Sequence, residues 1–453
     1  MSPMRRFVIA FCLAAMFPIW CGPAAAQVLL RDAEIENWIE DMSHPLYEAA
    51  GLQPETVNIY LIGDPTPNAA AGGLNMLIHT GLITLADTPN QVEGVIAHET
   101  GHIAGGHSAR TADAIARASR PAMLSLVLGA ALLAAGAPPA AGFGALGLGQ
   151  QVAQGNFLAY SRGQESAADQ AAVTYLDSVG HSSRGLLEFF DKLSNEQLIS
   201  GNRPPPYLLT HPLALQRSNA LRQRAEKSPF WEDPETDDEI YKLRMVQAKI
   251  HGFMNDPRVT HRQYPLTNQS DPARYARAVA YYRASDLEAA SREIDRLIAK
   301  HPDNPYFHEL KGQMLFEHGF VAEAVPPHRT SIKLAPQHAL LKVNLARALL
   351  ATEDTSGVDE AAVLLGQALR MEPGNSFAWT ELARAYSFQG HNALAALSQA
   401  EAYFYGGNAL NAHRFATRAR NDLQAGTPEY QQALDIIVAT EEDARKALRN
   451  GRR

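Results

Sequence analysis

The chain has 453 residues, enough for two or three domains at roughly 150 residues each. Hydrophobic residues make up 46% of it, far more than a disordered chain carries, and a mean hydropathy of −0.21 excludes a membrane protein with many spans. With 40 basic against 48 acidic side chains, the chain has no overall attraction for phosphate backbones, so we expect no nucleic-acid partner.

The N-terminus has the three parts of a secretory signal peptide. Arg5 and Arg6 precede an apolar run over residues 7–20, and Ala24-Ala25-Ala26 supplies the small residues that a leader peptidase reads. We expect residues 1–26 to be removed on export, because the apolar run is short for the roughly 20 residues of a membrane span. Both cysteines lie inside this segment, so disulfides are not expected in the mature chain.

Two short segments that follow have the character of strands. The first covers residues 57–62, and the second runs from Gly72 to His79, where apolar residues alternate weakly between glycines and the end of the run. A short strand bounded by glycine is typical of a sheet edge, to which an extended substrate segment can add. The residues of this expected substrate edge are Gly73, Leu74, Asn75, Met76 and Leu77.

The run His98-Glu99-Thr100-Gly101-His102 has the H-E-x-x-H pattern and follows an apolar segment. On a helix, residues i and i+4 lie on one face, so His98 and His102 can bind one zinc ion while Glu99 lies beside it. The pattern places a general base next to a Lewis acid, as metal-assisted hydrolysis requires. Because so short a pattern also arises by chance, the hypothesis requires a third ligand.

Residues 121–149 carry no charged side chain, and Pro138-Pro139 interrupts them near the middle. Each half is too short to cross a bilayer alone, which favours a hairpin. The sequence leaves two interpretations open: a hairpin buried in the core, or a surface hairpin that dips into a membrane and gives the chain a peripheral membrane contact.

The best candidate for the third ligand is Glu165, in the run S-R-G-Q-E-S-A-A-D over residues 161–169. Glu165 and Asp169 are again four residues apart, so one carboxylate can bind zinc while the other accepts a proton from a ligand imidazole and fixes its orientation. Carboxylates at this spacing usually form only the solvated face of a helix, but the residues around them favour the ligand pair. Further on, His211 follows a proline-rich loop and precedes Pro212, a context that by itself indicates only a helix start.

A second domain follows. We expect a helix from about Asp237 towards Gly252, which gives a first domain over residues 27–255, a linker over 256–270 and a second domain over 271–453. In the second domain, prolines recur near the period of about 34 residues that a tetratricopeptide unit has. Small residues occupy the matching close-packing positions of successive units: Ala278, Gly312, Ala346 and Ala383, then Ala290, Ala324, Ala361 and Ala395. The pattern predicts a solenoid of helix pairs that binds proteins or packs on the first domain.

In combination, the H-E-T-G-H run, the S-R-G-Q-E-S-A-A-D run and Thr210-His211-Pro212 with Arg217 resemble the peptidase family that includes HtpX and the prenyl-protein endoprotease. With its signal peptide and repeats, nearly the whole mature chain is similar to the BepA (YfgC) subgroup of periplasmic proteases. The resemblance implies a mainly α fold, with a gluzincin-type metalloprotease domain that contains a small β-sheet, followed by a tetratricopeptide α-solenoid.

The resemblance also implies a site and a substrate class. One Zn²⁺ per chain would be held by His98, His102 and Glu165, with Glu99 as the catalytic base and Asp169 supporting a ligand histidine. His211 would take the fourth zinc position and keep the enzyme latent. The implied clients are unfolded or stalled outer-membrane proteins in the periplasm, and the implied partner is the β-barrel assembly machinery.

Two other functions remain as alternatives. In the first, the chain is a mostly latent periplasmic chaperone or adaptor that binds proteins through its repeats, but an adaptor has no need of Glu99. In the second, the same residues hydrolyse a small substrate, which the protein-binding tail disfavours. The sequence also leaves open whether His211 inhibits the enzyme or stabilises the oxyanion during catalysis.

Overall fold

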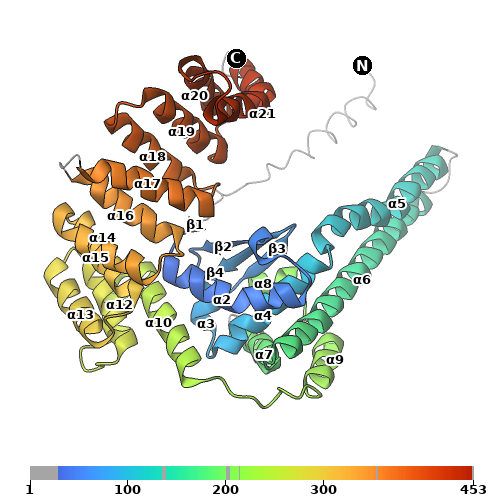
Figure 1. Ribbon diagram of the computed structural model, residues 1–453. Coiled ribbons are helices and arrows are strands. Elements are labelled where there is room, and N and C mark those ends of the chain that lie inside the picture. The colour runs from blue at the N-terminus through green and yellow to red at the C-terminus, as the bar shows by residue number, and fades with distance from the viewer. Residues whose placement is uncertain (1–28, 135–138, 200–204, 214, 353–355, 451–453) are drawn as a thin grey trace, which may run out of the picture.

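The computed structural model describes residues 29–134, 139–199, 205–213, 215–352 and 356–450. The expected signal peptide, residues 1–26, lies outside these ranges. Figure 1 shows a small sheet surrounded by helices and, beside it, a curved stack of helix pairs. In the described ranges, no helix combines the length and the apolar character needed to cross a membrane.

The sheet has four strands in the order β1-β2-β4-β3, namely β1 (Leu29–Leu30), β2 (Asn58–Ile62), β3 (Ala69–Gly72) and β4 (Asn75–His79). β4 runs parallel to β2 and antiparallel to β3, so both of its edges are paired. The strand itself was predicted, but its position at the sheet edge was wrong. Gly73, with a φ of +63°, and Leu74 turn the chain between β3 and β4, and Asn75, Met76 and Leu77 begin an inner strand.

Most helices of the first part pack around this sheet and share one hydrophobic core. Their bounds are α2 (Ala33–Ala49), the 3-10 helix η1 (Pro54–Thr56), α3 (Thr80–Leu85), α4 (Pro89–Ala104), α7 (Arg184–Ile199), α8 (Pro206–Thr210), α9 (Leu215–Ala225) and α10 (Asp237–Met254). Every residue of α4 from Pro89 to Gly101 is buried. The helix that carries the H-E-x-x-H pattern is therefore held on all sides.

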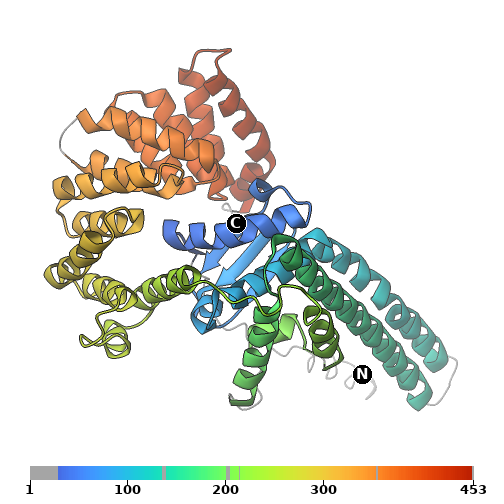
Figure 2. The same cartoon turned by 60° about the horizontal axis from the view of Figure 1, so that its bottom comes forward.

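A long hairpin of α5 (His107–Ala134) and α6 (Pro139–Val179) projects from this core, away from the stack of helix pairs (Figures 1 and 2). Along the described part of α5, successive apolar side chains are exposed: Met123, Leu124, Leu126, Val127 and Leu128. This finding favours the surface hairpin over the hairpin buried in the core.

The second part is the tetratricopeptide solenoid. Its helices form five successive pairs: α12 (Asp271–Arg283) with α13 (Leu287–Lys300), α14 (Pro305–Glu317) with α15 (Val321–Leu334), α16 (Ala339–Ala351) with α17 (Ser356–Met371), α18 (Ser376–Phe388) with α19 (Asn392–Tyr405), and α20 (Ala409–Asp422) with α21 (Pro428–Asn450). Of the eight predicted small residues, Ala278, Ala290, Ala324, Ala346 and Ala361 are fully buried, as close helix packing requires.

A buried polar group around Lys249 and the packing of α10 connect the two parts. Lys249 on α10 is 1% exposed, and its Nζ lies 2.7 Å from Asp32 and 3.2 Å from Glu34, to which Tyr275 of the first repeat also donates a hydrogen bond. α10 itself packs on α12, and α11 (Pro257–Gln263) lies within the expected linker. The division of the chain at residues 256–270 therefore remains a proposal.

A prediction about stability follows from a close contact between two helices of the solenoid, α14 and α15. A Cβ added to Gly312 would lie 2.7 Å from ring atoms of His328, which is 2% exposed. We expect Gly312→Ala to destabilise the fold by about 1–3 kcal/mol, because overpacking outweighs the gain in helix propensity. Urea unfolding measures this change in the free energy of unfolding. The matched control is Gly366→Ala on α17, where the nearest neighbour lies at 3.8 Å and a small gain is expected; equal effects of the two would contradict the argument.

Candidate metal centre

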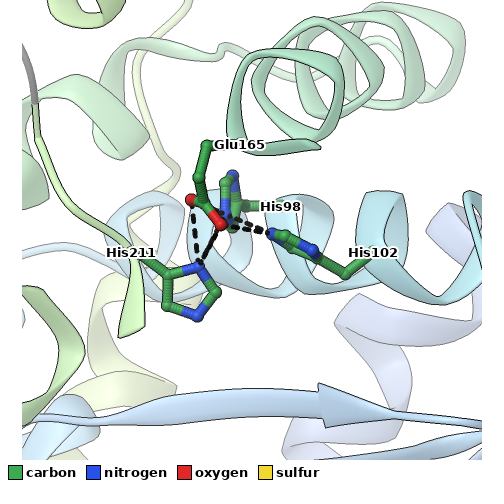
Figure 3. Close-up of side chains that lie close together, drawn as sticks. All are labelled: His98, His102, Glu165 and His211. Carbon is green, nitrogen blue, oxygen red and sulfur yellow. Dashed lines mark hydrogen bonds and ion pairs between the residues drawn. The ribbon is translucent and has the colours of Figure 1, made fainter. Parts of the chain in front are cut away.

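Four potential ligands converge from three elements at the end of the buried helix (Figure 3). α4 supplies His98 and His102, α6 supplies Glu165, and His211 directly follows α8. All four are largely buried, and one ligand atom from each lies within 4.8 Å of those of the others. In the described ranges, no other group of three or more histidine, cysteine or acidic residues has this geometry.

A glycine lets α4 and α6 approach closely enough to form the cluster. A Cβ at Gly101, inside the H-E-x-x-H run, would lie 3.0 Å from the backbone of Ala168 on α6. Ala168 is one helical turn from Glu165, so this close contact sets how far the carboxylate reaches towards the two histidines. Gly101 and Ala168 therefore set the distance between α4 and α6, and the geometry of the potential ligands depends on that distance.

Neighbouring groups orient the two histidines of α4. Nδ1 of His98 lies 3.0 Å from Asp169, and Nδ1 of His102 lies 2.9 Å from Nδ1 of His107. When both Nδ1 atoms carry the proton, both Nε2 atoms present a lone pair, and these atoms are 3.1 Å apart. Two lone pairs so close together call for a cation or a proton between them.

The electrostatics of the cluster agree with this picture. Burial lowers the pKa of His98, but contacts with Asp169 and Glu165 outweigh it and raise that pKa to about 9. Burial and the neighbouring His98 lower the pKa of His102 to about 2. Burial raises the pKa of Glu165, yet hydrogen bonds from His211 and His98 hold it far below its ordinary value. These shifts favour an ionised Glu165 beside the two imidazoles of α4.

Arg217 on α9 connects the two carboxylates of α6. Its guanidinium forms two hydrogen bonds with Asp169, of 2.5 and 2.8 Å, and lies 2.9 Å from Glu165. Burial raises the pKa of Asp169, but the hydrogen bonds from Arg217 and His98 lower it below its ordinary value. Asp169 therefore stays ionised and can accept the proton of His98.

Glu99 is fully buried, and neither of its carboxylate oxygens has a hydrogen-bond partner among the described residues. The nearest charged or basic atom is Nε2 of His211, at 3.4 Å. A buried carboxylate without a close donor is unfavourable, and a bound water would supply the missing hydrogen bond. Imidazole nitrogens with a carboxylate are ligands typical of zinc, so these residues fit a metal ion and a nearby water.

His211 covers this space. Its Nδ1 lies 3.1 Å from Glu165 and 3.4 Å from His98, while its Nε2 faces Glu99. Its ring stacks on Tyr207 at 4.6 Å between centroids, and the hydroxyl of Tyr207 is buried without a hydrogen-bond partner among the described residues. The imidazole of His211 therefore lies between the other three potential ligands and Glu99.

The structure brings together six of the residues singled out from the sequence: His98, Glu99, His102, Glu165, Asp169 and His211. The segment from Gly73 to Leu77 is not at a free edge. Instead β3 is at the edge of the sheet, beside α4 and α8. Sequence reasoning missed the contacts of His107 and Tyr207, and it quoted Arg217 only as part of a resemblance. The two glycines at 105 and 106 are the signal that could have indicated the position of His107. They turn the chain after α4, and α5 then begins with His107 beside α4.

The contact of His107 with His102 leads to a prediction. We expect His107→Ala to weaken metal binding by roughly 10- to 100-fold, the usual effect of losing a group that orients a ligand imidazole. Competition with a chromogenic chelator measures the affinity. His181→Ala is the control, because His181 is half-exposed and pairs with Glu93 away from the cluster. An unchanged metal affinity in His107→Ala would show that His107 contributes only to folding.

Comparisons with known proteins agree on one family. The sequence profile of peptidase family M48 matches residues 30–225. A putative beta-barrel assembly-enhancing protease of Vibrio cholerae is 25% identical over 427 residues, which cover 92% of this chain and 86% of the relative. The beta-barrel assembly-enhancing protease of Escherichia coli K12 is 25% identical, covering 91% and 85%. Metalloprotease LoiP of the same strain is 30% identical over 203 residues, covering 44% of this chain and 74% of LoiP.

Proposed function

The chain belongs to peptidase family M48 and is a metalloprotease, and on this basis we propose that it is a zinc endopeptidase acting on unfolded or stalled outer-membrane β-barrel proteins. The observation that carries the proposal is the convergence of His98, His102 and Glu165 next to Glu99, whose buried oxygens lack a partner among the described residues. Zinc is supported by the ligand types, two imidazoles and a carboxylate.

The protein's own groups have distinct tasks in hydrolysis. His98, His102 and Glu165 would hold the zinc ion, which would supply Lewis acidity for the scissile carbonyl and for a water molecule. Glu99 removes the proton from the attacking water and later returns it to the leaving amine. Asp169 and His107 keep the imidazoles of His98 and His102 in one orientation, and Arg217 keeps Asp169 ionised and in place.

Substrate binding is best supported at β3 rather than at β4. β3 (Ala69–Gly72) ends the sheet and lies beside α4. An extended segment that adds to this edge would pair its main chain with β3 and pass in front of the metal centre. Such pairing requires a segment whose own backbone groups are free. An unfolded β-barrel protein has many of these segments and a folded barrel has none, because its strands are paired all round.

The cellular role is proposed from the relatives and the N-terminus together. Two relatives are named for β-barrel assembly and align with nearly the whole chain. With the expected signal peptide, they support a periplasmic enzyme that works with the β-barrel assembly machinery. The solenoid offers a protein-binding surface, so we include chaperone activity in assembly alongside proteolysis. The position of His211 over Glu99 also favours the second candidate, a mostly latent adaptor.

One experiment separates these candidates. The purified mature protein and its His211→Ala variant are analysed for bound metal and then incubated with a β-barrel protein, either diluted from urea or folded in detergent. We expect about one zinc per chain, cleavage of the unfolded form only, loss of cleavage with a chelator and recovery with zinc. Glu165→Ala should lose the metal. If both proteins are loaded with zinc and neither cleaves the unfolded substrate, the peptidase proposal is wrong and the adaptor remains.

A further inference from the structure

We propose that the hairpin of α5 and α6 is a membrane-binding surface, which inserts into a bilayer containing anionic phospholipid and holds the metal centre at the lipid surface. Figures 1 and 2 show the hairpin extending from the protease domain on the side away from the solenoid. α5 packs mainly against α6, whereas α6 also packs against α4, α2 and α9 of the protease domain. The hairpin is therefore free to meet another surface.

Exposed aliphatic side chains concentrate on this hairpin. On α5, Leu124 is 71% exposed and Val127 is 69% exposed, with Met123, Leu126 and Leu128 between 56 and 65%. On α6, Val152 and Leu158 are 50 and 44% exposed. Single exposed apolar residues are common on soluble proteins, but a continuous group of this size marks an interaction site.

The length without charge suits a lipid layer. No charged residue and no histidine occurs between Arg120 and Arg162. From Pro121 to its end at Ala134, α5 rises about 20 Å at 1.5 Å per residue, and half of the hydrocarbon core of a bilayer is about 15 Å thick. Because both arms are helical, the backbone groups along each arm are hydrogen-bonded within it, which lowers the free-energy cost of entering lipid.

Charges at the base of the hairpin complement an anionic surface. Arg110, Arg117 and Arg120 are exposed on α5, and Arg162 is exposed on α6 close to where the uncharged stretch ends. Asp113 is the one acidic residue on α5. Basic side chains next to an apolar insertion are attracted by anionic headgroups. The net charge of the whole chain is −8, so this local excess of arginine is opposite to the overall balance.

The composition favours lipid over a protein partner. The exposed apolar side chains described on the hairpin are leucine, valine and methionine, whereas the centres of protein interfaces are enriched in tryptophan, tyrosine and arginine. A protein-binding surface also has a polar rim with hydrogen-bonding groups, and the sequence between Arg120 and Arg162 offers few of them. Aliphatic side chains without directional partners match hydrocarbon.

Insertion would fix the height of the active site, a consequence that rests on the proposed function. Glu165 follows Arg162 by less than one helical turn, about 5 Å along the axis of α6. If the arginines lie at the headgroups, the metal centre lies just above them. The enzyme would then act on polypeptide segments that emerge at the membrane surface, where β-barrel clients that have not inserted are expected.

The test measures lipid binding by the full mature chain with Glu99→Gln, so that self-cleavage does not interfere. The probes are vesicles of phosphatidylcholine alone and of phosphatidylcholine mixed with phosphatidylglycerol, analysed by flotation. We expect binding to the mixed vesicles and a loss of about tenfold or more in Leu124→Asp/Leu128→Asp, because charge is strongly disfavoured in hydrocarbon. The matched control, Val363→Asp/Val438→Asp, adds the same charge at solenoid positions that are 60 and 75% exposed, and should bind like the parent.

Two more variants guard against loss of folding. Arg117→Gln/Arg120→Gln should reduce the preference for phosphatidylglycerol, and Leu126→Trp should show a blue shift of its fluorescence when mixed vesicles are added. A parent protein that does not float, or a Leu124→Asp/Leu128→Asp variant that floats equally well, overturns the proposal. So does a hairpin that forms dimers without lipid and leaves vesicles unbound. Because the protein in this assay lacks the catalytic base, the result is independent of whether the enzyme cleaves β-barrel proteins.

Discussion

Glu99→Gln is expected to abolish proteolysis while metal binding and folding are retained. The side chain is fully buried and its oxygens have no hydrogen-bond partner among the described residues, so an amide of the same shape fits the space. It cannot accept a proton from water. General base catalysis contributes typically 10²–10⁴-fold, so kcat/KM should fall by about that factor. Initial rates on an unfolded protein, at equal zinc content, measure the effect.

The same helix offers a matched control. Glu93 is also buried on α4, but it pairs with His181 at 2.6 Å and lies away from the metal ligands. Glu93→Gln changes the same functional group within the same buried helix and should leave the rate within a few-fold of the parent. If Glu99→Gln keeps the parent rate, or if Glu93→Gln loses activity equally, Glu99 is not the base.

The core of the site could be predicted from the sequence because its spacings are local. His98 and His102 are one helical turn apart, as are Glu165 and Asp169, and a helix places each pair on one face regardless of the rest of the fold. Whether the histidine pair of α4 meets the carboxylate pair of α6 depends on how these two helices pack, which the local sequence does not determine. That depends on the contact of Gly101 with Ala168, and the sequence motifs indicated it only through their resemblance to a family.

The features that were missed depend on tertiary structure. β3 is Ala-Ala-Ala-Gly and has none of the β-branched or aromatic residues that indicate a strand, so its pairing with β4 left no local signal. His107 is off the ligand face of α4 if the helix is continued past His102. The chain instead turns at Gly106, whose φ is +59°, and α5 brings His107 back against His102. The helix expected near Pro212 begins at Leu215, which leaves His211 in an irregular segment.

His211→Ala is expected to raise basal proteolysis, including self-cleavage. The imidazole lies between Glu165 and Glu99, where we expect an attacking water to lie, so we expect the enzyme with His211 in this position to be inactive. Because His211 lies between α8 and α9, we expect it to move away without disruption of the core when a client binds. If the open form accounts for about 1–10% of molecules, removing the imidazole raises the rate by roughly 10- to 100-fold.

The opposite result has an equally clear physical basis. If His211 donates a hydrogen bond to the oxyanion after the segment moves, its loss would lower turnover by roughly 10²- to 10³-fold, as removal of such donors does elsewhere. Metal should stay bound in either case through His98, His102 and Glu165. Leu209→Ala on α8 is the control for loosening of the segment, since Leu209 lies two residues before His211 and is 66% exposed. Initial rates at equal zinc content decide the question: a rise only in His211→Ala identifies an inhibitory residue, and a fall identifies a catalytic one.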